Sequence, residues 1–469
     1  MENPTDSPKL ERTLGPVMLW GLGVGYVISG MYFGWNLGLA EGGTLGLAIA
    51  TFFIIIMYVT FTFSYTELAC AIPKAGGAFD YADRALGRNW GFVGGMAQII
   101  EFVFAPPAIA FAIGAYFTLI LPENWFLISL ADPSIFLLKP AELVILGHVF
   151  EGPWLAIIAY FLFTLLNIIG VKTAATFELI ITIFAVVELL IFAGVTLPEF
   201  KMVNLTTNSL PNGIPGIFAA IPFAIWFFLA IEGVANVAEE TKNPQKNVLI
   251  GFGSAILTLV ILCVLTFTSS VGVAGWEAVV ITGYDETGKA MTSDSPLPMA
   301  IAHVVGNSGW MYHLLLTIGL LGLIASFHGI ILAAGRATYE FGRQGLAPIA
   351  LGKVHSKYKT PANALIFNMV VGIIALLTGK TADIIVLAVF GALALYIISM
   401  ISFFVLRKNE PDMERPFKVP FYPVFPALAL IIASISMIAM SYYNQQLALV
   451  FLAILAGSFI LYKLVYAKK

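Results

Sequence analysis

Three glutamates stand inside long apolar stretches of this 469-residue chain, at Glu101, Glu188 and Glu232. A charged side chain at the centre of a bilayer costs at least about 2.5 to 3.5 kcal/mol, so such residues usually face a cavity or a partner. A buried carboxylate can hold an ammonium ion, and a buried carboxylic acid can carry a proton. The three positions therefore predict cation binding or proton transfer.

Each of these carboxyl groups also has a structural interpretation. Glu232 could cap loose backbone N–H groups beside Gly233, Glu101 could pair with His328 or a tyrosine, and Glu188 could bond a neighbouring helix. His328 is the one histidine clearly within an apolar segment, and an unperturbed histidine titrates near neutral pH. We assign proton coupling to Glu188 and His328 as a hypothesis, with a satisfied structural histidine as the alternative.

Two further glutamates, Glu67 and Glu178, lie near the ends of apolar segments and are interpreted as structural. Glu178 could reach water or pair with Lys172.

The elements that position these residues must be membrane helices. The chain is 59% hydrophobic and only 11% charged, whereas a soluble domain carries about 25% charged residues. Its net charge of −3 provides no basic surface for nucleic acid. Its two cysteines, Cys70 and Cys263, form no metal-ligand or disulfide pattern.

Runs of about 20 apolar residues predict twelve transmembrane helices. They cover 15–38, 44–71, 90–120, 152–170, 175–197, 214–238, 249–273, 308–340, 362–378, 382–405, 422–441 and 446–464. With both termini in the cytoplasm, the outer side receives only Lys139, Lys201, Lys289 and Lys380 of the 24 lysines and arginines. The positive-inside rule therefore predicts cytoplasmic termini. Loops 122–151 and 274–307 are then the long outer loops.

Two of the predicted helices carry signs of an interruption. The first contains Ser29 and Gly30 among several glycines, and a serine can bond its own backbone, so we expect a break at 28–31. The sixth contains Pro222 and then Glu232 beside Gly233, which predicts unwinding at 229–233. Interrupted helices at matching positions of two halves indicate a transporter site.

Five motifs along the chain carry a family resemblance. They are VISGMYFGWN (27–36), AIPKAGGAFDYADRALG (71–87), IWFFLAIEGVANVAEETKNPQKNV (225–248), GRATYEFGRQGLAP (335–348) and ERPFKVPFYPVFP (414–426). In this order they resemble the amino acid–polyamine–organocation superfamily. Segments ISGMYFGW, EFVFAPPAIAFAIGAYF (101–117) and AAIPFAIWFFLAIEGVA (219–235) are most similar to the bacterial ethanolamine permeases. The chain departs from that narrower pattern at Met31, because we expect the ethanolamine permeases to have an acidic residue at the matching position.

The resemblance implies an all-α membrane protein with the LeuT-like fold, that is, a 5+5 inverted repeat plus two C-terminal helices. The domains are then a cytoplasmic tail (1–14), a first repeat (15–197), a second repeat (198–405), and two last helices with a short cytoplasmic C-terminus (406–469). The implied activity is secondary transport driven by protons or by exchange.

The substrate would lie between the two interrupted helices. The residues that we expect to contact it are Ser29, Gly30, Met31, Glu101, Trp226, Leu229, Ala230, Ile231 and Glu232. The hydroxyl of ethanolamine would meet 29–31, and its ammonium would meet carbonyls at 229–231. The resemblance implies that Trp226 closes over the substrate, where its ring face can hold a cation.

Together with these features, the resemblance implies a permease of a bacterial inner membrane that imports ethanolamine or a related small amine by alternating access, with a coupling proton and without a cofactor or metal. The alternative of the same fold is a neutral amino acid permease or an exchanger. A membrane enzyme would need a catalytic cluster, and the five histidines form no pair at metal spacing. There is no P-loop for ATP-driven pumping, and no filter-like repeat favours a channel.

Overall fold

The computed structural model describes residues 14–74, 76–120, 128–129, 136–138, 142–145, 148–151, 153–169, 171–288, 290–378 and 380–466. The predicted N-terminal tail lies outside these ranges apart from Leu14. Lys139, Lys289 and most of loop 122–151 lie outside them too.

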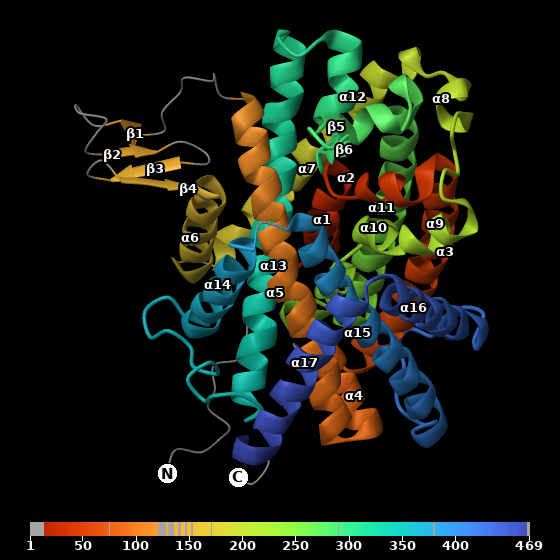
Figure 1. Cartoon of the computed structure of the whole chain (residues 1–469). Helices are drawn as coiled ribbons and strands as arrows, with labels where there is room; N and C mark the ends of the chain where they lie inside the picture. Colours follow the sequence, from red (N-terminus) through yellow and green to blue (C-terminus); the bar gives the residue numbers. More distant parts are fainter. Residues whose placement is uncertain are drawn as a thin grey trace.

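Apolar helices form the body of the molecule (Figure 1). The longest are α3 (Leu37–Ala71), α5 (Arg88–Ile120), α7 (Val171–Thr196), α11 (Pro244–Ala274), α13 (Trp310–Arg343), α15 (Thr381–Asn409), α16 (Val424–Tyr443) and α17 (Gln445–Leu461). The shorter ones are α1 (Pro16–Val27), α2 (Ser29–Tyr32), α4 (Ala78–Leu86), α6 (Trp154–Ile169), α8 (Met202–Thr206), α9 (Gly213–Ala219), α10 (Ile221–Trp226), α12 (Pro296–Val305) and α14 (Ala362–Leu376). Three segments are 3₁₀ helices, namely η1 (Leu197–Glu199), η2 (Ile231–Glu240) and η3 (Glu277–Val279), and η4 (Tyr462–Tyr466) is a π-helix.

Nine helical segments of the described residues are long and apolar enough to cross a bilayer. Three of the twelve predicted spans, 15–38, 152–170 and 362–378, coincide instead with the shorter apolar helices α1, α6 and α14. A fourth short apolar helix, α12, falls inside the predicted outer loop 274–307. The helix over the second span begins earlier than predicted because α3 continues through a kink at Gly43, whose φ is 65°.

The first predicted interruption is displaced along the chain. Ile28 separates α1 from α2, yet its backbone angles stay in the helical region. The backbone leaves that region at Phe33, which is extended, and at Gly34, whose φ is 82°. The break expected at 28–31 therefore lies mainly just after α2, where glycine supplies a conformation that other residues rarely adopt.

The second interruption lies where the sequence predicts it. Helix α10 ends at Trp226, and Ala230 adopts a left-handed conformation with φ 75°. The chain then continues as the 3₁₀ helix η2 rather than as an α-helix.

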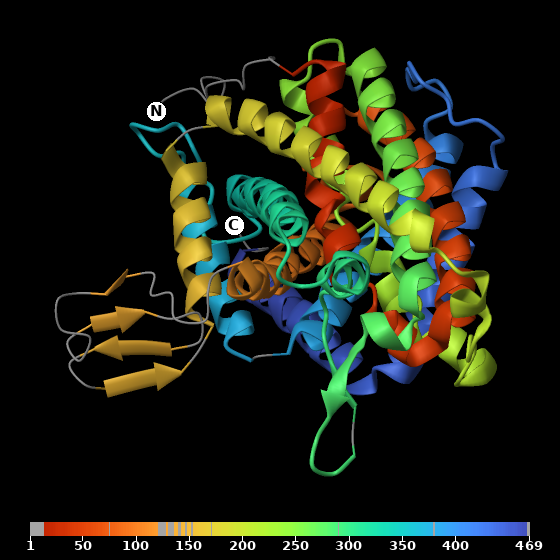
Figure 2. The ribbon, with the colours of Figure 1, turned by 90° about the horizontal axis from the view of Figure 1, so that it is seen from above.

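Two small antiparallel sheets accompany the helices, which the all-α prediction did not include. Strands β1 (Ile128–Ser129), β2 (Phe136–Leu138), β3 (Glu142–Ile145) and β4 (His148–Glu151) pair in chain order, with Leu137 opposite Val144. Strands β5 (Ile281–Tyr284) and β6 (Ala290–Thr292) form a hairpin in the other long loop. Figure 2 shows the four-stranded sheet beside α6, outside the helical bundle.

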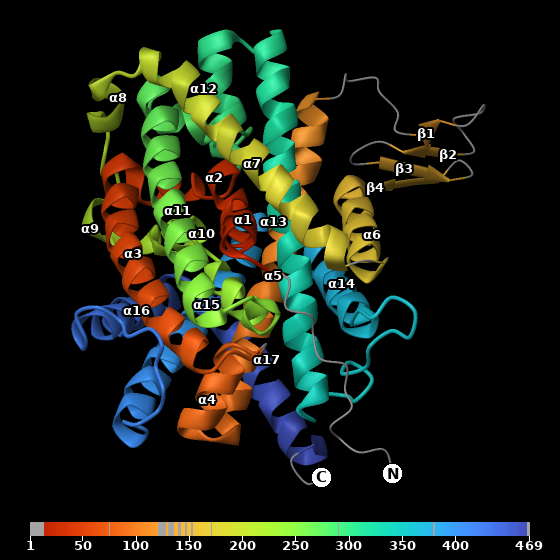
Figure 3. The ribbon, with the colours of Figure 1, turned by 180° about the vertical axis from the view of Figure 1, so that it is seen from behind.

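Helix α5 runs through the bundle and packs mainly against α15 and α13. Helix α7 crosses α1, α11 and α13 obliquely, as Figure 3 shows. We call the end of the bundle that carries α4 the inner end, and the end that carries α8 and α12 the outer end (Figure 1). Both interruptions lie between these two ends, surrounded by helices.

Large apolar side chains face outward on the peripheral helices. Examples are Phe161 on α6, Phe184 on α7, Leu257 on α11, Ile438 on α16 and Leu449 on α17. Such exposure is costly in water and ordinary in lipid, where only backbone groups need internal partners. The outer surface therefore fits a bilayer.

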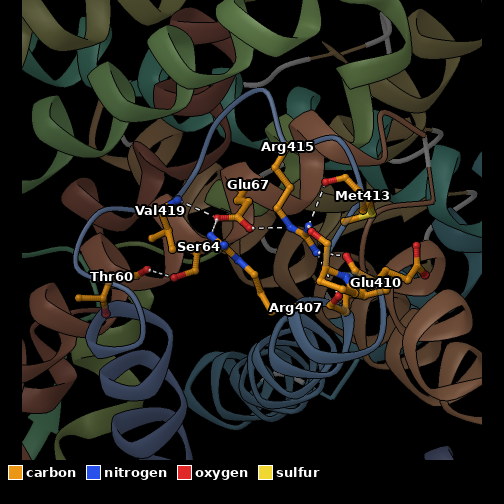
Figure 4. A network of polar contacts seen from close by, with 10 residues as sticks. Thr60, Ser64, Glu67, Arg407, Glu410, Met413, Arg415 and Val419 are labelled. Carbon is orange, nitrogen blue, oxygen red and sulfur yellow. Dashed lines mark hydrogen bonds and ion pairs between the residues drawn. The ribbon is translucent and has the colours of Figure 1, made fainter.

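A polar network holds α3, α15 and the segment before α16 together near the inner end (Figure 4). The Glu67 carboxylate pairs with Arg407 at 2.7 Å and with Arg415 at 3.2 Å. It also accepts the Val419 N–H at 2.7 Å. Glu67 thus has the structural surroundings that the sequence analysis assigned to it.

Candidate functional site

A small cavity lies between α1, α5, α10 and α13. Three predicted site residues line it together, namely Ser29, Trp226 and Leu229. Its remaining lining residues are Tyr26, Val27, Ala105 and Ile330. A mostly apolar wall with a few polar groups is typical of a small-ligand site.

The sequence analysis expected the hydroxyl of Ser29 to bond its own backbone, but in the structure it does not. It donates to Ser326 Oγ at 2.7 Å, and Ser326 donates to the Tyr26 carbonyl at 2.6 Å. This relay ties α2 and the end of α1 to α13. Ser29 therefore lines the cavity while it holds the first interrupted helix in place.

Gly30 and Met31 lie beside the cavity rather than on its wall. A Cβ atom on Gly30 would overlap the Trp226 carbonyl oxygen and lie 3.1 Å from the Phe227 Cα. Gly30 thus allows close contact between α2 and α10. Met31 is fully buried, and its carbonyl accepts the Trp35 indole N–H at 3.1 Å.

The Trp226 ring joins the two interrupted helices. Its Nε1 donates to the Phe33 carbonyl at 3.0 Å, and its ring meets the Phe33 ring edge to face at a centroid distance of 5.3 Å. The partner is the residue at which the first helix loses its helical backbone. A movement of that segment would therefore move the indole.

Glu101 satisfies the backbone of the second interruption. The N–H of Ala230, in its left-handed conformation, donates to Glu101 Oε1 at 3.1 Å. The structural alternative for Glu101 was a pair with His328 or a tyrosine; His328 bonds Glu178 instead, and the hydrogen bond to Glu101 comes from a backbone N–H. Ile231, the next predicted contact, is fully buried at the start of η2.

Glu232 and Glu101 are neighbours whose carboxyl groups interact with each other. Both are fully buried. The Glu232 Oε2 atom lies 3.1 Å from the Tyr396 hydroxyl, which lies 3.0 Å from the Tyr58 hydroxyl. The other oxygens, Glu101 Oε2 and Glu232 Oε1, have no donor among the described residues, unless one carboxyl group carries a proton and donates it to the other.

Neither carboxyl group forms an ion pair within the described part of the chain. Two adjacent carboxylates cannot both stay ionised in a dry interior without a cation, because each would repel the other. The pair therefore requires at least one bound proton or one positive charge from a ligand.

Glu188 lies in a different place, in a cavity nearer the outer end, lined by Tyr32 and Tyr116 and by apolar residues of α7, α12 and α13. Its Oε2 lies 2.6 Å from the Tyr32 hydroxyl, which also lies 2.9 Å from the Ala185 carbonyl oxygen. A phenol has one hydrogen, and a carbonyl only accepts. Both contacts are satisfied together when the Glu188 carboxyl group carries a proton.

His328 meets Glu178 rather than Glu101 or Glu188. Its Nδ1 lies 3.0 Å from Glu178 Oε2, and both side chains are buried. The sequence analysis suggested that Glu178 could reach water or pair with Lys172. In the structure it is paired across α7 and α13 instead. The structure separates the two predicted proton-coupling residues, since Glu188 and His328 have different partners.

Several site residues escaped the sequence analysis. Tyr26, Tyr58, Tyr396 and Ser326 supply hydroxyl or carbonyl groups at the cavity or at Glu232. Tyr396 carried a usable signal, since it is a tyrosine within the apolar run GALALYIISM. The others are single polar residues in glycine-rich or aromatic segments, where packing is the usual role. Across the described ranges, no group of three or more His, Cys, Asp or Glu side chains could hold a metal ion.

The chain has clear relatives among known proteins. The sequence profile of the amino acid permease family matches residues 17–466. An uncharacterized transporter of Rhizobium meliloti is 28% identical over 452 residues, which cover 94% of this chain and 90% of the relative. The branched-chain amino acid permease BcaP of Bacillus subtilis is 27% identical, with 90% of this chain and 86% of the relative covered. The methylthioribose transporter of the same bacterium is also 27% identical, with 90% and 87% covered.

Proposed function

The chain belongs to the amino acid permease family, and on that premise we propose that it imports ethanolamine or a closely related small amine by alternating access. Family membership supports a membrane transporter of a small organic molecule. The choice of an amine depends on this chain's own carboxyl groups.

The observation that carries the proposal is the unpaired couple Glu101 and Glu232. An ammonium ion between them would supply the positive charge that no described side chain supplies. It would also give their free oxygens the hydrogen-bond donors that they lack. If the ligand carried no positive charge, at least one of the two carboxyl groups would have to be protonated.

The cavity next to this pair has room for about one water molecule, so ethanolamine would bind in a conformation that widens it. Its hydroxyl would meet Ser29 and the backbone of α2, and its ammonium would turn toward the carbonyls at 229–231 and toward the two carboxyl groups. The Trp226 ring would lie over the cation. Gly30 and Met31 would support the residues that line the cavity without contacting the substrate directly.

A coupling proton would reside at Glu188, with the Glu178–His328 pair as a second candidate. The hydrogen count around Tyr32 favours a protonated Glu188 in this conformation. Because Tyr32 ends α2, loss of that proton would change a hydrogen bond on the interrupted helix itself. This arrangement would couple protonation to movement of the first interrupted helix.

The architecture that we propose for transport keeps the twelve spans, the 5+5 inverted repeat and the two additional helices. The repeats would cover 15–197 and 198–405, and both termini would be cytoplasmic. The inner end, with α4, would then face the cytoplasm of a bacterial cell. Support comes from the two interruptions and from the distribution of lysine and arginine.

Transport of a neutral amino acid, by uptake or exchange, is the second candidate function. It is favoured by the relative named a branched-chain amino acid permease. In that case the amino acid's own ammonium would meet the Glu101–Glu232 pair, and its carboxylate would also be required for binding.

The deciding experiment measures uptake of labelled ethanolamine into proteoliposomes, with and without an inward proton gradient. Choline, alanine and lysine are the competitors. We expect gradient-stimulated uptake that unlabelled ethanolamine blocks and alanine does not. Alanine uptake without ethanolamine uptake would make an amino acid the substrate and would exclude the proposed contact of the ethanolamine hydroxyl with Ser29.

A further inference from the structure

Three polar side chains converge on one point near the inner end of the molecule. A Cβ atom built on Gly77 would overlap the Oδ1 of Asn236, lie 3.2 Å from the Tyr65 hydroxyl and lie 3.3 Å from the Gln98 Oε1. These side chains come from η2, α3 and α5. We call Tyr65, Gln98 and Asn236 the cradle.

The cradle is buried, and most of its polar atoms have no partner in the part of the chain that the structure describes. Each of its side chains is at most 1% exposed. The Tyr65 hydroxyl, the Gln98 Nε2 and both polar atoms of Asn236 have no hydrogen bond among the described residues. More than nine-tenths of buried polar groups in proteins are bonded, so three such side chains at one point indicate a position that another state fills.

A continuous column joins the cradle to the Glu101–Glu232 pair. Asn236 follows Glu232 by four residues on η2. The Tyr65 ring stacks on Phe61, and the Phe61 ring packs on Tyr396, whose hydroxyl bonds Glu232. Tyr65 also interacts electrostatically with both carboxyl groups of the pair. The cradle therefore lies on the way from the central cavity to the inner end.

One short segment covers the cradle from the inner end. It comprises residues 76–80, which we call the plug. Gly77 has φ 54°, a conformation in which a side chain would be strained. The Gly76 N–H donates to Asp80 Oδ2 at 2.9 Å, which fixes the bend. Beyond it, the Tyr81 ring packs edge to face on Tyr65. The plug is thus fitted to the cradle, and within the described residues its side-chain polar contacts are the Gly76–Asp80 hydrogen bond and an ion pair of Asp80 with Lys74 at 4.0 Å.

We propose that the plug closes the substrate path at the inner end, and that the cradle binds the primary ammonium group of the substrate when the plug withdraws. The amide NH2 groups of Gln98 and Asn236 are donors, which the hydroxyl oxygen of the substrate would satisfy. A primary ammonium has three N–H donors, and the cradle presents three oxygens as acceptors. A quaternary ammonium has no N–H and leaves all three unsatisfied. The cradle is a transit site between the central cavity and the inner solution.

The amine in this inference rests on the proposed function, whereas the plug can be tested without any substrate. Both native cysteines, Cys70 and Cys263, are buried and are replaced by serine for the test. Gln98→Cys then reports on the cradle, and Ala97→Cys, one residue away and packed against Gly391 of α15, is the matched control. The probe is a membrane-impermeant trimethylammonium methanethiosulfonate, applied to inside-out and to right-side-out vesicles.

We expect Gln98→Cys to react at least about tenfold faster than Ala97→Cys, from the side of α4 only. Adding Gly77→Ala displaces the plug and should increase that rate further, provided the variant elutes as a monodisperse protein. Equal rates at the two positions, or reaction from the outer side alone, would overturn the plug.

The transit site is tested by the exchange of labelled ethanolamine in wild-type protein, Asn236→Ala and Gln98→Ala. Each variant removes one acceptor, so the maximal rate should fall about tenfold while half-saturation at the central site stays unchanged. An unchanged rate in both variants would overturn the transit site. If the wild-type protein carries no ethanolamine, the proposed function and the ammonium assignment fail together, and the labelling still decides the plug.

Discussion

At the level of single residues, the partners of a buried carboxyl group decide what that group can do. Glu67 has two guanidinium partners and a backbone N–H, so its charge is compensated. Among the residues that the structure describes, Glu101 and Glu232 have only neutral partners and each other. A compensated carboxylate is structural, whereas an uncompensated pair responds to a cation or to a proton.

Removing one charge of the pair should weaken amine binding without unfolding the protein. Glu101→Gln keeps an oxygen for the Ala230 N–H and loses the charge. We expect the half-saturating concentration of ethanolamine to increase about tenfold or more, since a charge-assisted hydrogen bond contributes about 1.5 to 3 kcal/mol. Uptake assays measure this, with Asp383→Asn, at a partly exposed position, as control. Unchanged half-saturation in Glu101→Gln and in Glu232→Gln would exclude contact with the ammonium.

Asp80 should make stability depend on pH. Burial, together with the nearby Glu340 carboxylate, raises the pKa of Asp80 from 3.8 to about 6. The folded state then holds the proton more tightly than the unfolded state, so stability is greatest below about pH 4 and decreases as the pH rises to about 6. The change is about 2 to 3 kcal/mol at most. Thermal unfolding in detergent between pH 4 and 7 measures it, and Asp80→Asn should flatten that dependence.

The sequence identified most of the residues at the centre but not their partners. Apolar surroundings marked Glu101, Glu188 and Glu232 as unusual, because charge is rare in such segments. Nothing in one chain indicated that Glu101 meets the Ala230 N–H, since that contact depends on how α5 packs against the unwound segment. The His328–Glu178 pair was missed for the same reason.

At the level of the elements, the two interruptions were predicted with different success. Ala230 lies inside the predicted 229–233 window, where a carboxylate beside glycine gave a local signal. The first break was displaced to Phe33 and Gly34, because several glycines in one helix do not indicate which of them adopts a positive φ. The short strands were missed, since four residues carry too little pattern to distinguish a strand from a loop.

The Glu67 network should be the main polar stabiliser of the joint between α3, α15 and the segment before α16. Glu67→Gln leaves the buried Arg415 without a counter-charge, so we expect a loss of about 3 kcal/mol in the free energy of unfolding. Thermal unfolding in detergent measures the loss. The matched control is Glu410→Gln, which breaks the partly exposed pair with Arg84 and should cost less than about 1 kcal/mol. Equal effects of the two substitutions would contradict the structural role of Glu67.

At the level of the whole molecule, an apolar exterior surrounds a core that is interrupted twice. The proposed orientation can be tested by topology reporters. We expect a reporter fused after residue 469, and one inserted between α13 and α14, to be active only in the cytoplasm. A cysteine tag in the β5–β6 turn should be labelled only from outside. Labelling of that turn from inside would reverse the orientation and with it the direction of the proposed import.

The 3₁₀ form of η2 has a mechanical consequence. Ten residues at about 2.0 Å per residue extend over about 20 Å, whereas the same residues in an α-helix extend over about 15 Å. Rewinding this one segment would thus shorten it by about 5 Å, close to the pitch of one α-helical turn. Glu232 lies at one end of η2 and Asn236 in its middle. A change of η2 between the 3₁₀ and the α-helical form would therefore change the distance between the central cavity and the inner end.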